Sequence, residues 1–152
     1  MQTTKAFRLS VVTNFLIITT MAVGSYVGKV GAGTACPDWP LCPLETDYFI
    51  VLEFAHRIIA FITFLAGLAS FIYSQRTGIA LVKKISLSAF AALLVQVFMV
   101  GALVIFTETA ALLVAAHQAA AATVASLYAA NTATLYLYAA ISKNRGAEAV
   151  LT

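Results

Sequence analysis

The stretch LLVAAHQAAAATVASLYAA, Leu112 to Ala130, contains no aspartate, glutamate, lysine or arginine. A helix of about 20 apolar residues crosses the ~30 Å hydrocarbon core of a bilayer. Inside lipid the backbone has to satisfy its own hydrogen bonds, and a helix does this within one segment. The stretch therefore predicts a membrane-spanning helix.

Three further apolar runs precede this one. Together the four runs cover approximately residues 7–27, 48–73, 85–106 and 109–141. Hydrophobic residues make up 62% of the chain and charged residues 10%, whereas soluble domains carry about 25% charged residues. We therefore predict an all-α fold, an integral membrane four-helix bundle that forms a single domain over residues 1–152, with an outer loop at 28–47.

Lysine and arginine indicate how this bundle is oriented. They gather at three membrane edges: Lys5 and Arg8, then Arg76, Lys83 and Lys84, then Lys143 and Arg145. With four spans these edges lie on one side, and the positive-inside rule makes that side the cytoplasm. We expect both termini in the cytoplasm, the protein in the plasma membrane, and the loop 28–47 outside. Because the positive charge is divided among three edges, we expect the lipid bilayer as partner and no nucleic acid.

The outer loop contains GAGTACPDWPLC, Gly31 to Cys42. Outside the cytoplasm disulfides form and persist. The prolines favour a turn that can bring Cys36 and Cys42 within bonding range. Such a pair is either a structural staple or a redox-active site, and its spacing leaves both open.

The two histidines of the chain both lie inside predicted spans. Ionisable groups are costly in a membrane and are functional candidates by default. His56 and His117 each lie about two turns below the outer start of their run, which is roughly 10 Å at ~1.5 Å per residue. The second and fourth spans run in the same direction. Two histidines at one depth on parallel helices can face each other.

Such a pair has several possible uses. A membrane histidine is often only a hydrogen-bonding residue between helices. A zinc or copper site needs three or four protein ligands, and a carboxylate-bridged di-iron bundle needs two Glu-x-x-His motifs. Haem needs only axial ligands, because the porphyrin supplies four nitrogens. Ligand count therefore favours haem iron.

Polar and small residues surround the two histidines. Glu53 shares a helix face with His56. Arg57 either pairs with Glu53 at the membrane edge or binds a haem propionate. Gln96 and Asn131 are predicted interhelical hydrogen-bond partners. Small residues within one turn of His117 can leave room for the porphyrin: Ala116, Ala120 and Ala121.

Several of these residues form a pattern that resembles the haem A synthase family. The pattern consists of Gly-x-Gly at 31–33, CPDWPLC at 36–42, EFAHR at 53–57 and a histidine early in the fourth run. The resemblance implies that His56 and His117 are axial haem ligands. Glu53 is then the acidic residue beside the reacting porphyrin edge, and Cys36 and Cys42 form the outer-loop disulfide.

Members of that family oxidise the C8 methyl of haem O to a formyl group, and they typically have eight spans in two similar halves. This chain resembles a compact, half-size member that takes haem O as substrate and uses haem b, haem O or haem A with iron at its site. We therefore expect a homo-oligomer, with an electron acceptor or a haem O synthase as further partners. Two other functions stay open: a membrane b-type cytochrome, and a quinone-linked disulfide-bond former, which usually needs two cysteine pairs.

Overall fold

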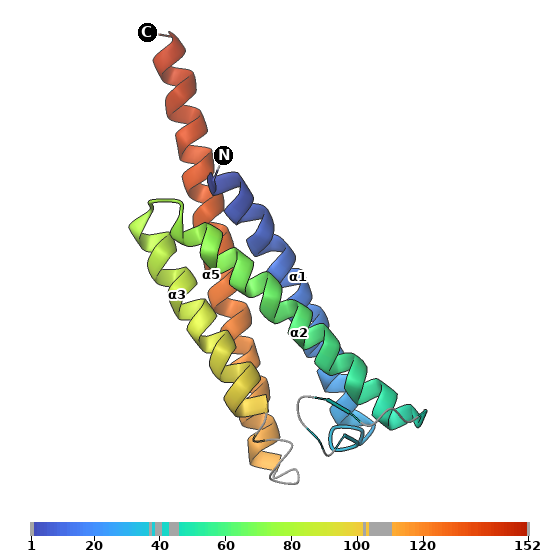
Figure 1. The fold of residues 1–152 in the computed structure, drawn as a ribbon. Coiled ribbons are helices and arrows are strands. Elements are labelled where there is room, and N and C mark those ends of the chain that lie inside the picture. Colours follow the sequence, from blue (N-terminus) through green and yellow to red (C-terminus); the bar gives the residue numbers. More distant parts are fainter. Residues whose placement is uncertain are drawn as a thin grey trace.

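The computed structural model describes residues 2–36, 38, 41, 42, 46–101, 103 and 111–151, and within these it contains helices and no strand. The helices are α1 (Gln2–Lys29), α2 (Tyr48–Gln75), α3 (Ala80–Leu94), its π-helical continuation η1 (Val95–Val100) and α5 (Ala111–Leu151) (Figure 1). Four helical segments in this part of the chain are long and apolar enough to cross a membrane. The predicted all-α four-helix bundle is confirmed to this extent.

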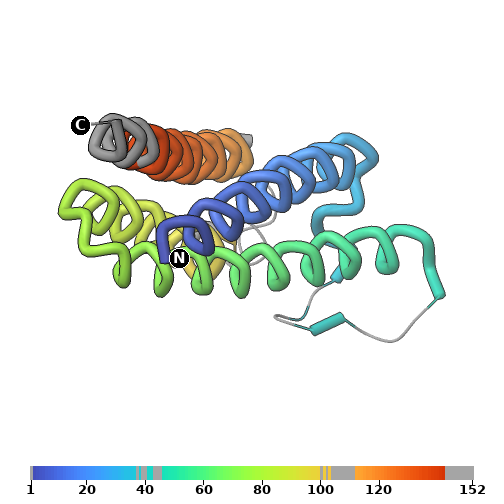
Figure 2. Tube along the Cα trace, turned by 90° about the horizontal axis from the view of Figure 1, so that it is seen from above, coloured from blue at the N-terminus to red at the C-terminus, as the bar shows by residue number. Residues whose placement is uncertain are grey.

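The helices run alternately up and down (Figure 1). The two chain termini and the turn between α2 and α3 lie at one end, which we call the terminal end. The connection between α1 and α2 and the start of α5 lie at the other, the loop end. The α1–α2 pair leans away from the α3–α5 pair towards the loop end, as the view from the terminal end also shows (Figure 2).

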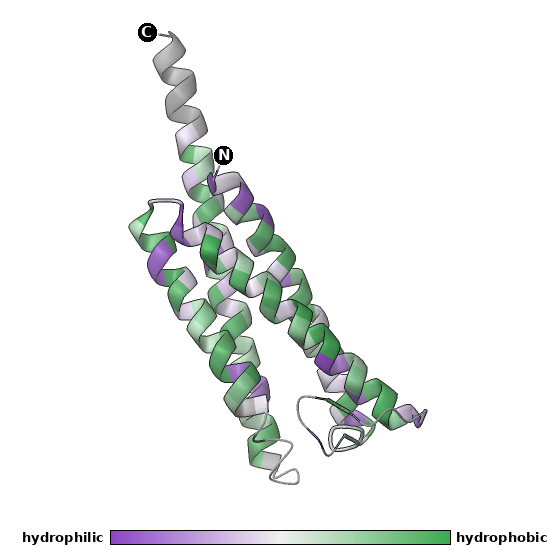
Figure 3. Cartoon of the chain, viewed as in Figure 1, coloured by the Kyte–Doolittle hydropathy of each residue, from purple (hydrophilic) through white to green (hydrophobic). Residues whose placement is uncertain are grey.

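Two helices begin earlier than hydropathy predicts. The first helix starts at Gln2 instead of residue 7, and the third at Ala80 instead of residue 85. Hydropathy identifies the apolar part of a helix, but backbone hydrogen bonding continues into the polar residues at the terminal end (Figure 3). The predicted end of the third span, at 104–106, and the predicted start of the fourth, at 109–110, lie outside the described residues.

Buried positions recur along each helix at alternating steps of three and four residues, as in coiled coils. The buried side chains include Ala6, Ser10, Thr13 and Ile17 on α1; Glu53, Thr63, Gly67, Ser70 and Ser74 on α2; Val82, Ser86, Ala89 and Leu93 on α3; and Val124, Tyr128, Asn131 and Leu135 on α5. We call these rows the inner stripes. Most of their members are small or polar, whereas large apolar side chains such as Phe15 (69% exposed) point outward. This distribution is typical of helices packed in lipid.

Close approach between helices is clearest at Gly67. A Cβ atom added there would lie 2.4 Å from Leu93 Cδ2 on α3 and 2.7 Å from the hydroxyl of Tyr128 on α5. Leu93 and Tyr128 belong to the main cluster of buried apolar side chains, together with Ile17. The glycine thus lets α2 approach both neighbouring helices.

Side-chain hydrogen bonds join three helices near the terminal end. The amide nitrogen of Asn131 donates to the hydroxyls of Ser10 at 3.3 Å and Ser74 at 3.2 Å. The hydroxyls of Ser10 and Thr132 are 2.7 Å apart, and Asn14 donates to Thr132 at 2.8 Å. The predicted interhelical role of Asn131 is confirmed.

Candidate functional site

Near the loop end, one residue from each helical segment of the bundle contributes to a single layer: Gly24 on α1, His56 on α2, Gln96 on η1 and His117 on α5. Gly24 lies against His56, and Gln96 contacts His117. We call these four residues the histidine layer. It continues the spacing of the inner stripes, so the same helix geometry that packs the core brings these side chains together.

The two histidines lie at similar depths. Helices α2 and α5 are parallel, and the hydroxyl of Tyr128 on α5 lies at Gly67 on α2 (Figure 1). His117 lies eleven residues before Tyr128, and His56 lies eleven residues before Gly67. Because parallel helices rise equally, by about 1.5 Å per residue, and a tyrosine hydroxyl lies about one turn from its own backbone, the two histidines sit within about one turn of the same level. Their imidazoles are close enough for electrostatic interaction.

His56 is held by packing. A Cβ atom on Gly24 would lie 2.6 Å from Cε1 of the imidazole and 3.2 Å from each ring nitrogen. Only glycine therefore leaves room for the ring in this position. The Nδ1 atom of His56 is buried and has no hydrogen-bond partner among the described residues.

His117 is held by a polar contact. The Gln96 amide nitrogen lies 3.2 Å from Nδ1 and 3.3 Å from Nε2 of the ring, and it donates to the His117 carbonyl at 3.1 Å. The predicted interhelical role of Gln96 is confirmed, and its partner is one of the two candidate ligands.

The alanines expected to make room beside His117 differ in position. Ala121 is half-buried and follows His117 on the inner stripe, and Ala120 is also half-buried. Ala116 is exposed, so its side chain faces away from the interior of this chain.

Glu53, one turn nearer the loop than His56, forms an ion pair with Arg57. The Arg57 Nε atom lies 3.0 Å from Glu53 Oε1, and Glu53 is only 5% exposed. The predicted ion pair between Glu53 and Arg57 is thus present. The contact between Arg57 and a haem propionate stays a prediction.

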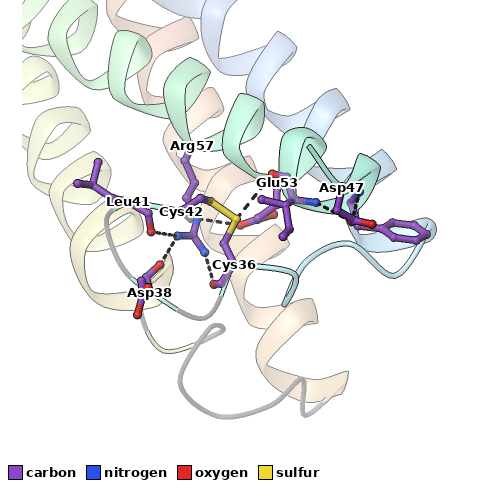
Figure 4. The surroundings of a disulfide bond; sticks show 9 residues. Cys36, Asp38, Leu41, Cys42, Asp47, Glu53 and Arg57 are labelled. Carbon is purple, nitrogen blue, oxygen red and sulfur yellow. Dashed lines mark hydrogen bonds and ion pairs between the residues drawn. A yellow bond between two sulfur atoms is a disulfide. The ribbon is translucent and has the colours of Figure 1, made fainter. Parts of the chain in front are cut away.

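The remaining guanidinium nitrogens of Arg57 bind the backbone of the cysteine loop (Figure 4). They donate to the carbonyls of Cys36 at 2.9 Å, Leu41 at 3.4 Å and Asp38. Several donors in a rigid fork allow one arginine to hold several acceptors. Arg57 therefore ties the loop to the helix that carries Glu53 and His56.

The loop is fixed at its start, at its end and by its cysteines. Gly31, at φ 81°, ends α1 in a Schellman motif, with Ala32 N–H bonded to the Val27 carbonyl. Asp47 caps α2 by accepting from the backbone N–H of Phe49 at 2.9 Å. Cys36 and Cys42 lie at disulfide-bonding distance, with Cα atoms 5.1 Å apart, as predicted. Whether the pair acts in redox chemistry stays open.

Sequence reasoning missed two features of this site. Gly24 was not singled out, although it lies four residues from Thr20 and three from Val27 on the α1 inner stripe. The three carbonyl partners of Arg57 have no sequence signal, because any residue supplies a carbonyl.

Comparison of the chain with protein-family models, curated proteins and solved structures found no match. The residues and geometry above define the class of protein: a four-helix bundle with membrane-capable helices, a layer of two histidines, and a cysteine loop over the same end.

Replacing Arg57 by leucine should release the loop. Cys36 is buried, so a thiol reductant can reach the disulfide only when the loop opens. Charge-assisted hydrogen bonds contribute about 1.5–3 kcal/mol each, so we expect the disulfide of Arg57→Leu to be reduced at least about tenfold faster. The rate is measured by thiol labelling of the purified protein.

Arg76→Leu is the matched control, because Arg76 lies over the Tyr73 ring at the terminal end. Its reduction rate should equal that of the wild type. Equal rates for Arg57→Leu and the wild type would show that the arginine does not restrain the loop.

Proposed function

We propose that this chain binds haem between His56 and His117 and acts as a compact haem A synthase, oxidising the C8 methyl of haem O to a formyl group. The observation that carries the proposal is the histidine layer: two imidazoles from parallel helices, at similar depths and within electrostatic range. The resemblance of the motifs around Cys36 and Glu53 to haem A synthases supports the choice of substrate.

The residues fit a haem. The chain has two histidines, and a six-coordinate low-spin haem takes two axial ligands from its protein. They come from opposite helix pairs, α1–α2 and α3–α5, which lean apart towards this end (Figure 1). The buried Nδ1 of His56 also lacks a partner among the described residues. When bound, the haem supplies the iron and the porphyrin edge at which oxidation takes place.

Glu53 is the residue best placed for proton transfer. It lies on the same helix face as His56, one turn nearer the loop, and is buried. A carboxylate in such a position can accept a proton from a reacting group or return one. Arg57 holds this carboxylate in place through the ion pair.

The proposal includes an orientation and partners. The cysteine loop faces the extracytoplasmic side of the plasma membrane, and both termini face the cytoplasm. Conversion of a methyl to a formyl group removes electrons and adds one oxygen, so an electron acceptor and an oxygen source must act with the chain. Two copies in a homo-oligomer provide two haem sites.

One observation favours a second function, that of a membrane b-type cytochrome. Glu53 pairs with Arg57, which also holds three loop carbonyls. This arrangement gives Glu53 a structural use that needs no substrate. A cytochrome uses the same pair of histidines and transfers electrons without changing its haem.

Pigment analysis separates the two functions. We expect the protein, produced with a supply of haem O, to carry a low-spin haem and to yield extractable haem A. His56→Ala and His117→Ala should each abolish the low-spin spectrum, because each removes an axial ligand. An unchanged spectrum in either variant would remove that ligand assignment, and full haem occupancy without haem A would favour the cytochrome.

Gly24→Ala should weaken haem binding without touching a ligand. The added methyl group would overlap the His56 ring and displace it. We expect about a tenfold loss of affinity, which a haem titration of the purified protein measures. Gly28→Ala is the matched control, one turn along the same helix with nothing within 4 Å of the added atom. Equal affinities in both variants would contradict the placement of His56.

Glu53→Gln keeps the size of the side chain and removes its charge and basicity. We expect the haem to stay bound while formation of haem A falls at least about 100-fold, as is usual for the loss of an acid–base group. Product yield is measured by extraction and mass, beside the haem content of the same sample. A normal yield of haem A would show that Glu53 serves only to hold Arg57.

A further inference from the structure

The side chain of Gln96 makes three contacts with a single residue of the neighbouring helix, His117. Its amide nitrogen donates to the His117 backbone carbonyl at 3.1 Å and lies 3.2 and 3.3 Å from the two ring nitrogens. Gln96 is 8% exposed. The carbonyl bond anchors the amide to α5 at the residue whose ring it touches, so the amide can restrain that ring.

The backbone around Gln96 departs from the α-helix. Gln96 is the second residue of η1, and the N–H of Gly101 donates to its carbonyl in the five-residue pattern of a π-helix. A Cβ atom on Gly101 would lie 3.3 Å from this carbonyl oxygen, so glycine suits the wider turn. Short π-helical segments are rare and occur frequently at functional sites. This one begins at the histidine layer.

The amide of Gln96 offers a donor and an acceptor. A neutral imidazole has one nitrogen that carries the proton and one with a free lone pair. When iron binds one nitrogen, the other carries the proton and requires an acceptor. The Oε1 atom of Gln96 is buried and has no hydrogen-bond partner among the described residues. It is therefore an acceptor that no described residue uses.

We propose that Gln96 is a positioning residue for His117: its amide orients the imidazole and determines which ring nitrogen carries the proton, which leaves the other nitrogen free to bind iron. This inference rests on the proposed function, because it treats His117 as a haem ligand. It assigns different supports to the two ligands. Packing on Gly24 holds His56, and a hydrogen-bonding amide holds His117.

The first test uses the ligand-free protein. The full chain is labelled with ¹⁵N-histidine, and its two histidines give two sets of ring signals by nuclear magnetic resonance. We expect His117 to show one tautomer in the wild type and a mixture of both in Gln96→Leu, with His56 unchanged. Identical His117 signals in wild type and variant would overturn the inference.

Gln75→Leu is the matched control. Gln75 is likewise an interhelical glutamine: it joins α2 to α3, since its amide nitrogen donates to the Lys83 carbonyl at 3.0 Å and to Ser86 Oγ at 2.9 Å. It lies at the terminal end, so we expect its loss to leave both sets of histidine signals as in the wild type. Gln96→Met, which preserves the length of the side chain, replaces Gln96→Leu if the latter loses its helical circular dichroism.

The second test is a haem titration of the same variants. Loss of a residue that supports a metal ligand typically costs 10- to 100-fold in affinity, and we expect this loss for Gln96→Leu and Gln96→Met. Gln96→Glu keeps an acceptor, so it should bind more tightly than either and lower the reduction potential of the haem. Wild-type affinity in Gln96→Leu would overturn the positioning role while leaving the proposed function intact. Absence of haem binding by the wild type would overturn both.

Discussion

Close contact between small and polar side chains holds this bundle together, as is expected of helices that span a membrane, where lipid removes the usual advantage of burying large apolar side chains. Lipid tails are as apolar as leucine, so a helix gains little by turning Phe15 inward. Backbones that approach closely gain dispersion contacts and bring polar groups within hydrogen-bonding range. Gly67 and Gly24 serve this purpose in two layers: the first admits Leu93 and Tyr128, the second admits the ring of His56.

The same constraint explains why an interior of this kind accommodates ionisable groups. A buried polar group is costly unless it finds a partner, and the inner stripes supply partners from neighbouring helices. Asn131 finds two serines near the terminal end, and His117 finds Gln96 near the loop end. His56 has a buried nitrogen without a partner among the described residues. A ligand at that nitrogen would remove the cost.

Arg57 connects the site to the loop above it. One guanidinium pairs with Glu53 and holds the carbonyls of three loop residues. The carboxylate proposed for proton transfer and the cysteine loop therefore share a single cation. Any movement of the loop changes the surroundings of Glu53, and any charge change on Glu53 changes the hold on the loop. In a cytochrome the same connection would serve only to close the bundle.

Local properties of the sequence were sufficient to predict four helices and the pairing of Cys36 and Cys42, and they placed His56 and His117 at similar depths. Hydropathy and helix rise depend only on the residues of each segment. The direction of each helix follows from its place in the chain, because successive spans alternate in direction. The tertiary structure decided the rest: Gly24 as the support of His56, Gln96 as the partner of His117, and loop carbonyls as partners of Arg57. These contacts join residues far apart in the chain. They depend on how the helices are rotated and how closely they approach, and no single segment specifies either.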